Sequence, residues 1–112
     1  MSVSFRGFNE NSATFMTTKD MEKGTPVKMS ASDTVAPCSN GDAFCGVVNI
    51  SSGSYASVQL SGAVTAKYTG TAPSAGYTKL VSGATGVKAG ENGREYLVVS
   101  VDTVNSTVTF LL

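Results

Sequence analysis

Few residues of this chain could carry out catalysis or bind a metal ion. Its 112 residues include two cysteines, Cys38 and Cys45, and no histidine. Without histidine the chain lacks the base of a Ser-His-Asp or Cys-His nucleophile system and the imidazole ligands that zinc and iron use. Two thiols without other soft ligands do not make a metal site. We therefore expect no enzymatic activity, no cofactor and no metal.

The state of the two thiols depends on the compartment in which the protein works. In a cytoplasm both are expected to stay reduced. Outside a cell, a disulfide could close the short loop between them. The sequence leaves both states open.

Three glycine-containing loops hold the other polar candidates. Residues 41–46 could present Cys45 as a nucleophile, but no base lies nearby. Residues 90–95 supply two carboxylates and an arginine, too few oxygen ligands for a calcium loop. Residues 83–86 lack the following helix and the Gly-Lys-Ser/Thr of a phosphate loop. We interpret all three loops as turns.

Composition narrows the class of protein further. Charged residues make up 14% and hydrophobic residues 41% of the chain, and the formal net charge is zero. This mixture is too apolar for a disordered chain, and the eight basic residues are too dispersed for a nucleic-acid surface. The N-terminus lacks the basic and apolar segments of a secretory signal, and no apolar run reaches the roughly 18 residues of a membrane span. We expect one small domain that matures in a cytoplasm, without a membrane or nucleic-acid partner.

Short segments rich in valine and threonine recur along the chain, and these residues suit a pleated, half-buried surface. Turn residues such as those at 40–42 and 91–93 separate the segments at a spacing of about ten residues. The expected strands are residues 3–5, 13–16, 27–29, 34–36, 44–50, 56–60, 63–68, 77–81, 87–88, 95–101 and 107–112. The sequence predicts an all-β fold, a small β-barrel or sandwich of short strands.

The chain also repeats itself weakly at an offset of about 50 residues. Residues 24–29 match 76–80, which places Lys28 and Lys79 at equivalent positions, and Val35 corresponds to Val87. This pattern predicts two similar β-modules, 24–60 and 76–112, joined by residues 61–75. We expect the modules to share one core with pseudo-twofold symmetry.

The N-terminal segment differs from both modules. Val3, Phe5 and Phe8 alternate with polar residues, and Arg6 adds a fork of hydrogen-bond donors. The segment is either a first strand of the barrel or an arm that docks on a partner, because exposed Phe and Arg commonly anchor interfaces. We therefore divide the chain into an N-terminal arm (1–12) and a single β domain (13–112). Val3, Phe5, Arg6 and Phe8 are the candidate partner-binding residues.

Four short motifs follow one another in the first module. They are Gly-Thr-Pro-Val at 24–27, Asp-Thr-Val-Ala-Pro at 33–37, Gly-Val-Val at 46–48, and Val-Gln-Leu-Ser-Gly-Ala-Val-Thr at 58–65. A weaker copy follows at 75–77 and 85–89. Over about residues 23–112 this series resembles the small capsid decoration, or cement, proteins of tailed phages and prophages. The two cysteines and the N-terminal segment have no counterpart in that pattern.

The resemblance implies a non-enzymatic structural protein of the virion. Such a protein binds the outside of a capsid shell through the major capsid protein, stabilises the shell and forms a homo-oligomer, a trimer. It would be assembled in the cytoplasm of the bacterial host and end on the capsid surface. The alternative is a receptor- or glycan-binding module of a phage fibre or surface structure, which an aromatic platform or a calcium cluster would favour.

Overall fold

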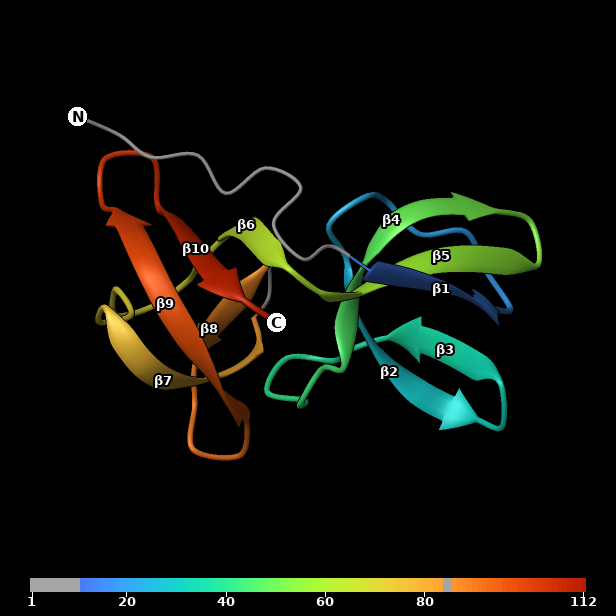
Figure 1. Cartoon of the computed structure of the whole chain (residues 1–112). Coiled ribbons are helices and arrows are strands. Elements are labelled where there is room, and N and C mark those ends of the chain that lie inside the picture. The colour runs from blue at the N-terminus through green and yellow to red at the C-terminus, as the bar shows by residue number, and fades with distance from the viewer. Residues whose placement is uncertain (1–10, 84–85) are drawn as a thin grey trace.

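The chain folds into two five-stranded β-units that lie side by side along the long axis of the molecule (Figure 1). The computed structural model describes residues 11–83 and 86–112, and every regular element within them is a β-strand. The predicted all-β fold with a small barrel is therefore confirmed. Val3, Phe5, Arg6 and Phe8, together with the strand expected at 3–5, lie outside the described residues.

The strands closely follow the valine- and threonine-rich segments. They are β1 (Asn11–Met16), β2 (Pro26–Ala31), β3 (Thr34–Pro37), β4 (Gly46–Ser52), β5 (Tyr55–Ser61), β6 (Ala63–Lys67), β7 (Gly76–Ser82), β8 (Val87–Ala89), β9 (Arg94–Asp102) and β10 (Thr107–Leu111). Tight turns separate the hairpin strands. Asp33, between β2 and β3, has a φ of 61°, a left-handed conformation that aspartate tolerates better than most residues.

The first unit is a closed barrel with the strand order β1-β3-β2-β4-β5. Adjacent strands of this barrel pair antiparallel, except that β1 and β3 pair in parallel at Met16 and Thr34. The second unit has the order β6-β10-β9-β7-β8, in which each strand has its counterpart in the first unit. An isolated parallel bridge between Tyr68 and Val87 brings the β6 end of that sheet to β8. Both units therefore share one topology, and the second is closed by a single bridge.

A β-bulge at the same place in both units fixes which residues correspond. Between β4 and β5 the register shifts after Val48, which leaves Asn49 as the extra residue. Between β9 and β10 the register shifts after Val98, which leaves Val99 as the extra residue. Val48 therefore corresponds to Val98, and the residues just before them correspond in the same way.

The buried side chains form two clusters rather than one shared core, because each sheet curls around its own inner face. The first unit encloses Val27, Val35, Val48, Ala56 and Val58. The second unit encloses Val64, Leu80, Val87, Tyr96, Val98, Val108 and Phe110, and it also takes in Phe44 and Val47 from the first unit. The outward face of the first barrel thus contributes to the core of the second unit.

The pairing registers bear on the expected equivalence of the two lysines, and the two sides of the strand give different answers. Toward β4 and β9, Pro26 pairs with Val47 as Tyr77 pairs with Leu97, which places Lys28 at the position of Lys79. Toward β3 and β8, Lys28 pairs with Ala36 as Val81 pairs with Lys88, which places Lys28 at the position of Val81. The expected match therefore holds on one side of the strand and not on the other.

Two segment boundaries also differ from the sequence expectation. Asn11 and Ser12, assigned to the N-terminal arm, are the first residues of β1. Residues 61–75 are more than a connection, because they contain β6, the first strand of the second unit. The strand expected at 44–50 begins at Gly46, so Phe44 and Cys45 lie in the loop before it.

Candidate interaction surfaces

The loop between β3 and β4, residues 38–45, joins the two units. Its Phe44 ring lies 5.1 Å from the Tyr96 ring, centroid to centroid, with an angle of 8° between the planes. Phe44 also meets Phe110 edge-on at 6.1 Å. The Tyr96 hydroxyl donates a buried hydrogen bond of 2.9 Å to the Phe44 carbonyl oxygen. A side chain of the first unit is therefore held in the core of the second by stacking and by a hydrogen bond.

Backbone and side-chain bonds fix the rest of this loop. The Gly41 N–H donates to the Ser82 carbonyl, and the Ser82 N–H donates to the Asp42 carbonyl, each at 2.8 Å. The Asp42 carboxylate accepts hydrogen bonds from Lys28 Nζ at 2.7 Å and from the Ser39 N–H at 2.9 Å. The lysine bond holds the pKa of Asp42 below, and that of Lys28 above, their ordinary values. The loop is thus attached both to β2 of its own unit and to β7 of the other.

The two thiols flank this loop and are free. Burial raises the pKa of Cys38 to about 11, and the nearby Asp42 carboxylate adds to the shift. Burial also raises the pKa of Cys45. A raised pKa lowers the thiolate fraction at neutral pH, and the thiolate is the form that attacks electrophiles and binds metals. The arrangement therefore favours packing over reactivity for both residues.

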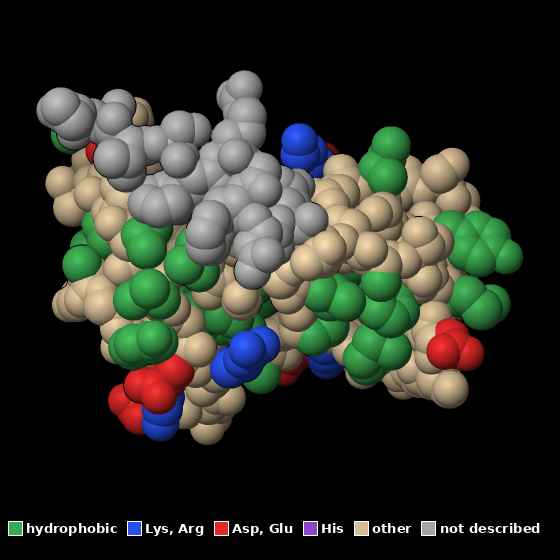
Figure 2. All heavy atoms as spheres, viewed as in Figure 1, with side chains coloured by type: hydrophobic (Ala, Val, Ile, Leu, Met, Phe, Trp, Pro, Cys, Tyr) green, Lys and Arg blue, Asp and Glu red, His purple; other side chains and the backbone are tan. Residues whose placement is uncertain are grey.

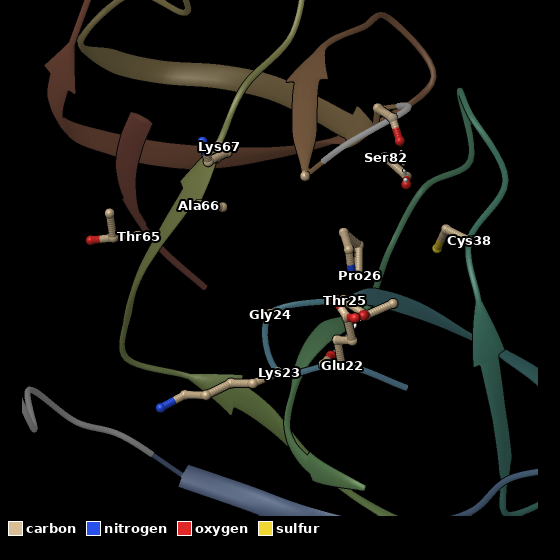
Figure 3. A pocket seen from close by; sticks show the side chains of 12 residues that line it. Glu22, Lys23, Gly24, Thr25, Pro26, Cys38, Thr65, Ala66, Lys67 and Ser82 are labelled. Atoms are coloured by element: carbon tan, nitrogen blue, oxygen red, sulfur yellow. Dashed lines mark hydrogen bonds between the residues drawn. The ribbon is translucent and has the colours of Figure 1, made fainter. Parts of the chain in front are cut away.

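A pocket of about 530 Å³ opens between the two units. The first unit lines it with residues 22–25 and with Pro26 at the start of β2, and the second with β6 and the end of β7, including Lys67 and Ser82. The close-up shows the Lys23 side chain pointing away from Cys38 and Ser82 (Figure 3). The pocket thus lies where the outward face of the first barrel meets one end of the second unit. We call this end, which includes Lys67 and Ser82, the open end of the second unit.

The polar loop at 90–95 is solvated, but the expectation that it is a hairpin tip is wrong, because β8 and β9 both pair with β7 and not with each other. Glu91 lies 3.8 Å from Lys79 Nζ, and its side chain is 96% exposed.

Within residues 11–83 and 86–112, no group of three or more acidic, cysteine or histidine side chains could hold a metal ion. In the same described part, no helix is long and apolar enough to cross a membrane.

Hydrophobic side chains lie exposed on the outer face of the second unit. Tyr77 pairs with Leu97, Leu97 with Leu111, and Leu111 with Ala63, so that one row crosses β7, β9, β10 and β6. Tyr77 is 74% exposed and the other three are half-buried. Figure 2 shows hydrophobic atoms gathered over this part of the surface. We call these four residues the outer row.

A second group of exposed hydrophobic side chains lies on the first barrel, where β1 and β3 meet. Met16 pairs with Tyr55 on β5, and it meets Thr34 on β3. Met29, on the neighbouring β2, pairs with Val35. Met16, Met29 and Tyr55 are 49%, 47% and 57% exposed. We call these three residues the barrel end.

Neither surface was among the binding residues predicted from the sequence. A signal was nevertheless present for Leu97, because Leu-Val-Val at 97–99 is continuously apolar and one of its side chains must face outward. Tyr77 and the barrel-end methionines lie in ordinary strand patterns, and only the pairing register shows what lies beside them.

No family model matches the chain, and no curated protein matches it.

Proposed function

We propose that this chain is a non-enzymatic structural protein of a tailed-phage virion, which binds the outside of the capsid shell and stabilises it. Its partner is the major capsid protein, and it forms a homo-oligomer, a trimer, on or before binding. It would be made in the bacterial cytoplasm and end on the virion surface. The proposal starts from the resemblance of residues 23–112 to capsid decoration proteins.

One observation supports the resemblance at the level of structure. Its motifs in the first module form consecutive strands, and each contributes a buried valine to the same core. These valines are Val27, Val35, Val48 and Val58, with relative exposures between 0% and 1%. The motifs thus mark the four strands that build the first core.

The surface of the chain suits a structural role. The outer row and the barrel end provide two apolar surfaces on a protein with no net charge. Both thiols have raised pKa values, so neither is activated as a nucleophile. A protein that binds only an assembled shell stabilises that shell by mass action and needs no catalytic group.

The N-terminal segment is proposed as a capsid-binding arm. Phe5 and Phe8 would fill pockets on the partner, and backbone hydrogen bonds would add a strand to it. The test is co-sedimentation with capsids assembled without this protein, from the phage or prophage that encodes it. We expect saturable binding by the full chain. Deletion of residues 2–10, which leaves β1 intact, should weaken it.

A double change, Phe5→Ala with Phe8→Ala, should reproduce most of that loss, about 1–4 kcal/mol if both rings are anchors. Asn9→Ala, in the same segment, is the matched control and should bind as the unaltered chain does. Absence of any binding by the full chain would contradict the capsid role. Unchanged binding after the deletion would contradict the arm but leave the capsid role standing.

A further inference from the structure

The outer row has a counterpart in the first barrel, and that counterpart is covered. Pro26 pairs with Val47, and Val47 pairs with Gln59, which gives the same row across β2, β4 and β5. Val47 and Leu97 correspond, because each directly precedes the valine before the bulge. Pro26, Val47 and Gln59 are all buried. In the second unit the same row includes Tyr77, which is 74% exposed.

The second unit itself covers the first row. Val47 packs in the core cluster of the second unit, beside residues of β6, β7, β9 and β10. Pro26 lines the inter-unit pocket opposite Lys67 on β6 and Ser82 on β7 (Figure 3). The chain therefore contains one example of a unit that seats its outward row on the open end of the next unit.

The barrel end of the first unit is the counterpart of that receiving surface. Met16 pairs with Tyr55, the first residue of β5, as Lys67 pairs with Thr107, the first residue of β10. Met29 pairs with the core residue Val35, as Ser82 pairs with Val87. Two residues that face the inter-unit pocket in the second unit are thus replaced in the first by exposed methionines.

From these correspondences we infer that the outer row of one chain binds the barrel end of a second copy of the same chain. The contact repeats between chains the arrangement that already joins the two units within a chain. Methionine side chains adapt to irregular surfaces and make favourable contacts with aromatic rings, which suits Met16 and Met29 as partners for Tyr77.

This contact joins two different surfaces, so it is a head-to-tail contact that builds a closed ring if the rotation between copies closes. It deepens the self-association part of the proposed function. The test of this contact uses the purified full chain without capsids. A failure of self-association can then be distinguished from a failure of capsid binding.

The test is sedimentation velocity on two variants, alone and mixed. Tyr77→Glu disables the outer row, and Met16→Glu with Met29→Glu disables the barrel end. Val104→Glu is the matched control, because Val104 is 90% exposed in the β9–β10 turn and belongs to neither surface. Far-UV circular dichroism checks that each variant keeps its β-fold.

We expect the unaltered chain and Val104→Glu to form the same oligomer. Each surface variant alone should be monomeric, with an association constant reduced roughly thirtyfold or more, as for the loss of an interface hot spot. An equimolar mixture of the two variants should form a dimer with one copy of each. The intact outer row of the barrel-end variant can bind the intact barrel end of the Tyr77→Glu variant, and no further copy can be added.

Three outcomes would overturn the inference. A barrel-end variant that still dimerises by itself would show that the outer row of one copy binds the outer row of another. A mixture that stays monomeric would show that the row and the end do not meet. An unaltered chain that is monomeric up to about 100 μM, where a contact with a micromolar Kd would be saturated, would show that neither surface mediates self-association.

Discussion

Phe44 of the first unit stacks on Tyr96 of the second, and the Tyr96 hydroxyl donates to the Phe44 carbonyl oxygen. Two residues 52 positions apart thus join the units through one side chain and one backbone group. The Arg94 guanidinium lies 5.3 Å from the centre of the same Tyr96 ring. The second core is therefore complete only when the 38–45 loop of the first unit is in place.

Removing the Phe44 ring should destabilise the whole molecule. Phe44→Ala deletes a buried aromatic side chain and leaves a cavity in the second core, which should cost about 3–5 kcal/mol of unfolding free energy. Urea unfolding followed by circular dichroism measures this loss. A loss below about 1 kcal/mol, typical of a surface substitution, would show that the second unit does not depend on Phe44.

The hydrogen bond can be tested apart from the ring. Tyr96→Phe keeps the stacked pair but leaves the buried Phe44 carbonyl without its donor, which should cost about 1–2 kcal/mol. Tyr55→Phe is the matched control, because Tyr55 is 57% exposed, and it should change stability by less than about 0.5 kcal/mol. Equal effects of the two substitutions would argue against a stabilising role for the Tyr96 hydroxyl.

The Lys28–Asp42 ion pair should make the stability depend on pH at both extremes. Lys28 lowers the pKa of Asp42 from its ordinary value of 3.8, so the stabilisation is present above that pH and is lost as the pH falls below it. The pKa of Lys28 is raised from 10.5, so the stabilisation that the charged lysine contributes is lost as the pH rises past that value.

Urea midpoints measured across the pH range test this pair. The difference between the unaltered chain and Asp42→Asn should be constant between roughly pH 5 and 9 and should shrink toward both extremes. In a Lys28→Met background, Asp42→Asn should lose the part of its pH dependence that comes from the ion pair. A pH dependence that is the same in both backgrounds would contradict the pairing.

The thiols should react slowly in the folded protein. A pKa of about 11 in place of 9.0 lowers the thiolate fraction of Cys38 about a hundredfold near pH 8, so alkylation by iodoacetamide should slow in proportion. A Cys45→Ser chain isolates the Cys38 rate, and the same chain unfolded in guanidinium gives the reference. Asp42→Asn should speed the folded rate, because the Asp42 carboxylate helps to raise the Cys38 pKa. Folded and unfolded rates that agree would contradict the burial of this thiol.

Sequence reasoning located most strands and turns because both depend on local patterns. Valine- and threonine-rich runs mark the strands, and Asp33 and Asn40–Gly41 mark turns between them. The four motif valines were expected in strands and form the first core. These features could be predicted because side-chain alternation and turn chemistry act over a few residues.

The joining of the two units could not be predicted in this way. Phe44 looks like the start of a strand, and its buried position depends on Tyr96 in the other unit. Gly46 stands where the second unit has Tyr96, and a Cβ there would lie 2.7 Å from Val58 Cγ1. The first barrel thus excludes the ring that the second unit places at the same point. Such long-range differences between two similar modules leave little trace in a single sequence.

The central claim, that the protein stabilises a capsid shell, is tested most directly by heating that shell. Capsids assembled without the protein are scanned by calorimetry alone and with a saturating excess of the purified chain. At about 100 times its Kd a ligand that binds only the assembled shell adds about 2.7 kcal/mol per site, so the disruption temperature should rise once the protein concentration passes the Kd and should go on rising slowly with the logarithm of that concentration. A disruption temperature that does not change at saturation would contradict the account.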